Sequence, residues 1–213
     1  MTYLEAVNYV LRRLRETTVS TVTETTYSTL IGGFVNDARQ MVEDAFDWGS
    51  LHDELTITTA ASTASYTLDG AGEKAHVTLV VDDTNNHVLT QVNADWIASK
   101  IQINDTEGPP YYYAFDEVAS DLDPKMVFYP TPDGTYSIKV QTDKSGSDLS
   151  SDGAVLPVPY FPVVQYALAM AREERGDVGQ SPGTVYEVAN KALASAVMTE
   201  AAKRPEKVHW TVQ

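Results

Sequence analysis

YSTLIGGFVNDARQMVEDAFDWGSLHDELTITT, residues 27–59, contains the change of pattern that decides the fold. Its first part places apolar residues three and four positions apart, which is the period of an amphipathic helix, and Gly49 ends that pattern. From Asp53 onward the sequence alternates with a period of two and is rich in Thr, Val, Ile and Tyr, which is typical of strands. The stretch therefore predicts a long helix followed directly by a β segment.

The β segment is expected to continue to residue 145, divided by turn signals such as Asp69-Gly70 and Asp133-Gly134. Several hairpins in one continuous stretch favour a small antiparallel barrel or sandwich. Strands are predicted near residues 54–59, 64–68, 75–82, 87–92, 110–116, 125–130 and 135–142, with a short helix over 95–101.

Helical patterns flank the β segment on both sides. Thr2 followed by Glu5 is the pattern of a capping box, and it precedes a helix predicted over residues 3–15. After the β segment, one helix is expected to end at Gly176 and an Ala-rich helix to span residues 182–203. Val188 is predicted to share one face of this last helix with the alanines.

Two helices on each side of a β segment predict an α+β fold, in which one helical bundle built from both ends of the chain carries an inserted antiparallel β domain. A polar stretch, DKSGSDLSSDG at residues 143–153, is interpreted as a linker. The expected boundaries are residues 1–52 and 146–203 for the helical bundle, 53–145 for the inserted β domain and 204–213 for an extended C-terminal arm.

The chain is strongly acidic, with 30 acidic and 15 basic residues among 213 and a formal charge of −15 at pH 7. Like-charge repulsion disfavours high-affinity binding to nucleic acid and to anionic membranes. The absence of cysteine excludes disulfides and thiolate metal sites. The first residues lack the pattern of a signal peptide, and no apolar run reaches the roughly 18 residues of a membrane span, so no membrane association is expected.

Motifs that would carry catalysis are not found in the sequence. The four histidines show no metal-ligand spacing, and no GxSxG, Walker A or GxGxxG pattern occurs. We therefore expect no enzyme activity, no metal and no cofactor. Paired acids leave open a carboxylate-based glycosidase, although turns and solvated strand ends are the ordinary interpretation of such pairs. The pairs are Asp82 with Asp83, Asp116 with Glu117, and Asp121 with Asp123.

Aromatic residues in the β segment leave a second alternative open. Tyr111, Tyr112 and Tyr113, together with Trp96, Phe128 and Tyr129, would suit a platform for sugars, as in a carbohydrate-binding module. Alternation along a strand sends Tyr112 to one face and its two neighbours to the other, which favours packing in a core or an interface. A sugar platform would require exposed, coplanar rings.

The C-terminal segment differs from the rest of the chain because it is basic and has the pattern of a strand. Residues 203–213 include three basic residues and one acid, and Pro205 prevents a continued helix. Val208, Trp210 and Val212 alternate as in a strand. Such an arm either frays in solution or orders on a partner, by adding a strand or by burying its tryptophan in a pocket. Tryptophan is a common anchor at protein interfaces.

The order of these features resembles that of phage head-to-tail adaptor proteins, the group that includes the tail tubular protein A of T7-like phages. The similarity runs in order through nearly the whole chain, and the last helix and the arm complete it. It rests on LRRL at residues 11–14, the stretch 27–48, FYPTPDGTYSIKV at 128–140 and LPVPYFPVVQYALAMAREERGD at 156–177.

The resemblance implies a non-enzymatic structural protein of the virion, located at the head-tail junction. Its subunits would form a ring, expected to be a dodecamer, between the portal protein and a tail nozzle or tail tube protein. Double-stranded DNA would pass through the lumen without specific binding, because acidic walls repel the DNA backbone. A carbohydrate-binding module of a phage tail is the alternative. In the adaptor, the arm would dock on the portal through Lys203, Arg204, Lys207, Val208, Trp210 and Val212.

Overall fold

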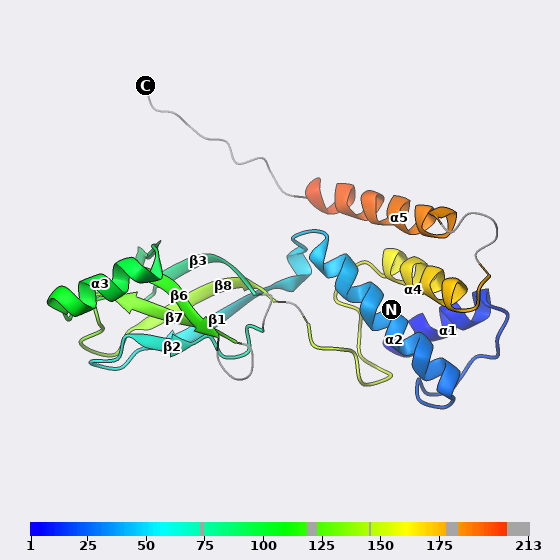
Figure 1. The fold of residues 1–213 in the computed structure, drawn as a ribbon, viewed down its shortest axis with the longest axis horizontal. Coiled ribbons are helices and arrows are strands. Elements are labelled where there is room, and N and C mark those ends of the chain that lie inside the picture. Colours follow the sequence, from blue (N-terminus) through cyan, green and yellow to red (C-terminus); the bar gives the residue numbers. More distant parts are fainter. Residues whose placement is uncertain (73–74, 119–122, 145, 178–182, 204–213) are drawn as a thin grey trace, which may run out of the picture. The chain divides into compact units, whose positions relative to one another are not determined.

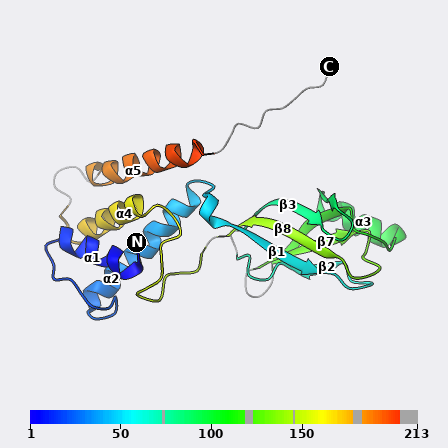
Figure 2. The same ribbon diagram turned by 180° about the vertical axis from the view of Figure 1, so that it is seen from behind.

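The computed structural model describes residues 1–72, 75–118, 123–144, 146–177 and 183–203 of the chain. Contacts divide the chain into two compact units: a helical unit, Met1–Ser50 with Ser147–Gln213, and a β unit, Leu51–Gly146. Figures 1 and 2 show helices from both ends of the sequence, coloured blue and yellow to red, within the helical unit. The predicted α+β fold class is confirmed.

Helix α4 is the centre of the helical unit. It packs against α1 and α2 on one side and against α5 on the other (Figure 1). This position explains why nearly all of its side chains from Pro162 to Ala171 are buried. Among the described helices, none is long and apolar enough to span a membrane. The four helices of this unit are α1, Tyr3–Arg13; α2, Thr26–Asp44; α4, Tyr160–Glu174; and α5, Gly183–Ala201.

Side-chain caps fix where the first two helices begin. The Thr2 hydroxyl accepts a hydrogen bond from the Glu5 N–H at 3.2 Å, and the Glu5 carboxylate accepts one from the Thr2 N–H at 2.8 Å. Thr25 and Ser28 form the same reciprocal pair at the start of α2. Each pair satisfies backbone N–H groups that the first helical turn leaves unpaired, so the predicted capping box at Thr2 is confirmed.

The stretch interpreted as a polar linker is bound to the helical unit over much of its length. Arg39 of α2 donates to a backbone carbonyl at the start of residues 147–152 at 3.0 Å. Asn36 donates to the Leu149 carbonyl and accepts from its N–H, at 3.2 and 2.9 Å. Asp152 accepts from a backbone N–H in the loop after α1 at 2.9 Å. The linker interpretation is therefore wrong for this part of the chain, because polar side chains of α2 hold its backbone in place.

The β unit contains two four-stranded sheets and one helix. A 3-10 turn, Gly49–Leu51, precedes the first strand in the sequence. The elements are β1, His52–Thr58; β2, Ser65–Thr67; β3, His76–Asp82; β4, His87–Val88; β5, Thr90–Gln91; α3, Ala94–Asn104; β6, Tyr112–Val118; β7, Pro124–Tyr129; and β8, Ser137–Asp143. The strand orders are β1-β8-β3-β4 in the first sheet and β2-β7-β6-β5 in the second.

Alternating side chains of both sheets enclose one apolar core. Helix α3 packs against β6 and β7 of the second sheet. The shared core makes the two sheets a sandwich, one of the two architectures left open by the sequence, and in the described residues they do not close into a barrel. The buried core side chains include Ile57, Val80, Tyr113, Met126, Phe128, Ile138 and Val140.

The strand predicted over residues 87–92 is divided between the two sheets. Its first half, β4, pairs with β3, and its second half, β5, pairs with β6 in parallel. The Leu89 N–H donates to the Val80 carbonyl at 2.9 Å, whereas the Thr90 N–H donates to the Tyr111 carbonyl at 2.9 Å. The prediction of one strand in a wholly antiparallel domain is therefore corrected. The chain crosses between the sheets at Leu89, because this buried side chain enters the core that the sheets share.

Candidate partner-binding surfaces

The C-terminal arm leaves the helical unit at an exposed helix end. Lys203 follows α5, and its ammonium group pairs with the Glu200 carboxylate at 2.7 Å. Lys203 is exposed, so it is accessible to a partner. The other five predicted portal-binding residues lie outside the described ranges, and their assignment stays a prediction: Arg204, Lys207, Val208, Trp210 and Val212.

Helix α5 packs on α4 through a narrow strip of small side chains. Ala189 is fully buried and Ala192 nearly so, whereas Val188 is 53% exposed and Met198 is 74% exposed. The face that Val188 is predicted to share with the alanines is therefore covered only in part, because α5 packs mainly on one helix. The outward surface of α5 is therefore partly apolar and available to a partner.

Two polar contacts support the packing of α5 on α4. The Tyr166 hydroxyl donates to the Asn190 side chain at 2.6 Å. The Tyr186 hydroxyl donates to the Glu173 carboxylate at 2.6 Å. The hydrogen bond to Glu173 raises the pKa of Tyr186 to about 12, because it holds the phenol in its protonated form beside a negative charge. These two contacts fix the position of α5 along the axis of α4, which a strip of small apolar side chains alone would define poorly.

Further apolar side chains are exposed on α2 and at the start of α4. Leu30 and Met41 of α2 are exposed, although both fit the helical period of the apolar stripe. At the start of α4, Tyr160 and Phe161 form an exposed edge-to-face pair with ring centroids 6.4 Å apart. The helical unit therefore presents apolar side chains on more than one surface, which is the property that a subunit needs to contact two neighbours through different faces.

The aromatic residues of the β unit pack against one another. The Trp96 ring of α3 meets Tyr112 and Tyr129 edge-on, with centroids 5.1 and 5.7 Å apart and interplanar angles of 62° and 88°. The Lys100 ammonium lies 5.3 Å from the centre of the same indole. Tyr113 is buried in the core on the opposite face of β6, as strand alternation predicts. The edge-on contacts of Trp96 hold α3 on its sheet, whereas Tyr111 is exposed and stacks on His87 with ring centroids 4.6 Å apart.

Two of the paired acids hold turns of the β unit. Asp82 is fully buried and accepts from the backbone N–H groups of Thr84 and Asn85 at 2.9 and 3.1 Å. Asp123 accepts two backbone N–H groups, those of Gly70 and Gly72, both at 2.6 Å. These contacts support the ordinary interpretation of the acids as turn-forming residues. Asp121 and the side chain of Glu117 lie outside the described structure.

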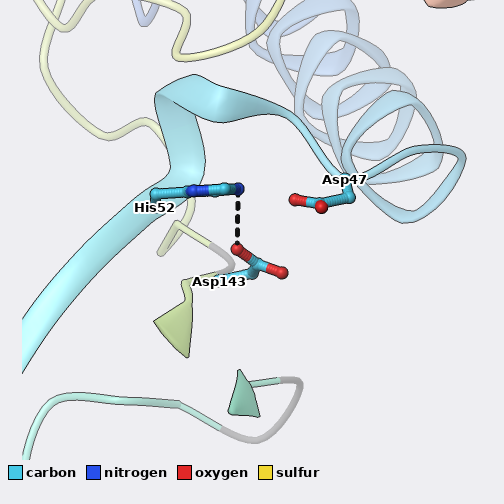
Figure 3. Close-up of side chains that lie close together, drawn as sticks. All are labelled: Asp47, His52 and Asp143. Atoms are coloured by element: carbon cyan, nitrogen blue, oxygen red, sulfur yellow. Dashed lines mark ion pairs between the residues drawn. The ribbon is translucent and has the colours of Figure 1, made fainter. Parts of the chain in front are cut away.

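A row of three polar side chains lies at one end of the first sheet. Asp143 of β8 is the cross-strand neighbour of His52 in β1 and of His76 in β3. His52 Nε2 lies 3.1 Å from Asp143 Oδ1 (Figure 3), and His76 Nδ1 lies 3.6 Å from Oδ2. Figure 3 also draws Asp47, which belongs to the helical unit and is not part of this row. Sequence spacing did not identify the row, because strand register brings together residues far apart in the chain.

Comparison with known families decides the identity of the chain. A model of the SU10 adaptor protein family matches residues 1–209, which include both units and most of the arm. The chain belongs to the SU10 adaptor protein family. A search of curated proteins finds no match. Membership of the SU10 adaptor family supports the resemblance to phage head-to-tail adaptors, whereas the narrower likeness to tail tubular protein A stays a prediction.

As a member of the SU10 adaptor protein family, the chain is a structural phage adaptor. Adaptors of this kind interact with portal and tail components. Sequence patterns predict apolar positions on these helices but do not single out the exposed ones, Leu30, Met41, Val188 and Met198. The same period of three and four describes a stripe that is buried within a subunit and one that is buried between subunits. Only the packing of α4 between its neighbours separates the two.

Proposed function

We propose that this SU10 adaptor protein is a structural head-to-tail adaptor that assembles as a ring between the portal and the tail, with double-stranded DNA passing through the lumen. The observation that carries the proposal is the family match over residues 1–209. The resemblance supplies the expected dodecamer and the expected partners, a portal protein and a nozzle or tail tube protein. The role is non-enzymatic and is located at the head-tail junction of the virion.

The surfaces of the helical unit support ring assembly. A ring subunit contacts one neighbour with one surface and the next neighbour with a different surface. Leu30 and Met41 of α2 and Val188 and Met198 of α5 are exposed, and these two helices pack on different sides of α4 (Figure 1), which suits the two contacts. Burying such side chains stabilises an interface by about 1.5–3 kcal/mol for each residue that is fully covered.

The charge of the chain supports DNA transit. The β unit sequence includes 15 acidic and 5 basic residues, so −10 of the total charge of −15 lies in residues 51–146. Repulsion from an acidic wall acts over a Debye length of about 8–10 Å at physiological ionic strength. A lumen lined with acids would therefore keep phosphates from forming the counterion-releasing contacts that make DNA binding tight.

An amber mutation in the gene for this protein tests the assignment. Particles made without the protein are expected to be heads with portals but without attached tails, as seen by negative-stain electron microscopy. Wild-type protein supplied from a plasmid should restore tailed particles, and this is the matched control. Normal attachment of tails in its absence, with only host binding reduced, would instead favour the carbohydrate-binding alternative.

A further inference from the structure

The sandwich of the β unit is open along one side. β1 is the last strand of the first sheet and β2 is the last strand of the second, and in the described part of the chain no strand pairs with their outer edges. Between them lies a groove of about 430 Å³ lined by Leu55–Thr58 of β1 and by Ser65–Asp69 in and after β2. We call this groove the seam. Two free strand edges on one groove are the geometry that accepts an added strand.

The alternation of hydrogen bonds along β1 shows which of its backbone groups face the seam. Lys144 donates to the Leu51 carbonyl and Thr59 donates to the Tyr136 carbonyl, at 2.8 and 2.9 Å, so odd-numbered residues of β1 bond to β8. In an antiparallel pair, alternate residues bond to opposite sides. The N–H and C=O groups of Thr56 and Thr58 therefore point away from β8 and toward the seam.

Hydrogen bonds alternate in the same way along β2. Phe128 donates to the Ala64 carbonyl and Leu68 donates to the Pro124 carbonyl, at 2.9 and 3.0 Å, so even-numbered residues bond to β7. The backbone groups of Thr67 and its odd-numbered neighbours point toward the seam. The bottom of the seam presents apolar groups, because the half-buried Leu55 and Tyr66 pack there against the core. An extended peptide with apolar side chains at alternate positions would fit both the edges and the bottom.

The chain itself contains such a peptide. Val208, Trp210 and Val212 alternate in the C-terminal arm, which begins at Lys203 on an exposed helix end. The ten residues after Lys203 reach up to about 33–36 Å when fully extended. Trp210, seven residues after Lys203, can therefore lie up to about 23–25 Å from the end of α5.

Charge also matches the arm to the seam. Residues 203–213 carry three basic residues and one acid, whereas the β unit carries a formal charge of −10. Asp69 is exposed in the lining of the seam, and Glu54 lies one residue before the lining part of β1. Opposite charges steer a basic strand to this groove and disfavour an acidic one.

We propose that the seam of the β unit receives the C-terminal arm of a second copy of this chain, by strand addition with Trp210 directed to the apolar bottom. The proposal deepens the proposed function, since it links neighbouring subunits, and it names a receptor for the arm other than the portal. The test needs only the purified full-length chain, without portal or tail proteins. Failure of the test would leave the adaptor function standing.

The experiment uses full-length chain in which p-benzoylphenylalanine replaces Trp210. Light and 15N-labelled chains are mixed, irradiated and digested, and crosslinked peptides are identified by mass spectrometry. The expected result is mixed light-heavy crosslinks from position 210 to residues 55–58 and 65–69. Crosslinks to another surface, crosslinks within single chains only, or none at all would overturn the proposal. Crosslinking only to added portal would overturn it as well and would place the arm there.

Edge variants test strand addition against simple proximity. Thr56→Pro removes an N–H that points into the seam and leaves the pairing of β1 with β8 intact, and Thr56→Val keeps that N–H. We expect Thr56→Pro to lower the yield of mixed crosslinks by about fivefold or more, and Thr56→Val by less than about twofold. Thr67→Pro and Thr67→Val repeat the comparison on β2. Far-UV circular dichroism confirms folding, and equal yields in folded Pro and Val variants would contradict strand addition.

Discussion

Two adjacent glycines in α2 provide a sharp test of the helical packing. A Cβ atom added at Gly32 would lie 2.5 Å from Tyr3 Oη and 2.8 Å from Val22 Cγ1, whereas one added at Gly33 would meet nothing within 4 Å. Tyr3 and Val22 have little room to move, since both are buried and Asp152 accepts the Val22 N–H at 2.9 Å. The two positions share one helix and one residue type, so each is the control for the other.

The two substitutions are expected to change stability in opposite directions. Replacing glycine by alanine within a helix gains about 0.5–1 kcal/mol when the space is open, so Gly33→Ala should raise the free energy of unfolding by that amount. Gly32→Ala gains the same propensity but adds an overpacking cost of about 1–3 kcal/mol, because the new methyl group clashes with packed side chains. The variants should therefore differ by about 1–3 kcal/mol, with Gly32→Ala the less stable.

Urea unfolding followed by circular dichroism at 222 nm measures this difference, because the helical unit contains four of the five described helices. Both variants should retain the wild-type slope against urea, so that midpoints report stability. A Gly32→Ala protein as stable as Gly33→Ala would refute the close approach of α1 and α2 at this position.

Substitutions at three further contacts test the packing of each unit. Asp123→Ala should destabilise the β unit by about 1–3 kcal/mol in urea unfolding, because two backbone N–H groups of the turn, those of Gly70 and Gly72, lose a charged acceptor, and a loss below about 0.5 kcal/mol would contradict this. Arg39→Leu should cost about 3–5 kcal/mol, because the buried Glu43 carboxylate loses the guanidinium 3.2 Å away, whereas adding Glu43→Leu should restore most of the loss. The raised pKa of Tyr186 stabilises the folded state below about pH 10, and this stability is lost as the pH rises through about 12. The difference in tyrosinate absorbance between the wild type and Tyr186→Phe reports this residue, and it should titrate near pH 12. In a Glu173→Gln background the same difference should titrate nearer to about pH 10. Titration near 10 in the presence of Glu173 would show that the bond is not formed.

Local sequence patterns predicted most elements of the fold, because local rules determine them. The capping box at Thr2, the change to strand pattern after Asp53 and the strand alternation around Tyr112 each depend on residues within a few positions of one another. These features agree with α1, with β1 and with the packing of β6 between α3 and the core.

The features that sequence patterns missed depend on contacts between distant residues. Nothing near residue 149 shows that Asn36, 113 positions earlier, holds its backbone. The sequence around Leu89 predicts one continuous strand. Only the core that both sheets share explains why the chain crosses from the first sheet to the second at this residue. Val188 fits the buried period of its helix, and its exposure reflects how little of α5 its neighbour covers.

The same reasoning explains what could be predicted of the candidate surfaces. The arm was identified from its own composition, since Pro205, Trp210 and the basic residues stand out in an acidic chain. The seam could not be identified in this way, because it is formed by two strand edges and depends on which strands end their sheets. Sequence thus suggested the peptide, and the fold supplied a receptor for it.

Reconstitution with the cognate portal tests the central claim most directly. Mass photometry of the full-length chain mixed with purified portal rings should show saturable addition of a whole ring of subunits, with the portal peak shifting to one larger discrete mass. Portal mixed with an unrelated acidic protein of similar size is the control. If the portal mass stays unchanged at every salt and protein concentration at which both proteins are folded, the adaptor function proposed for this chain is contradicted.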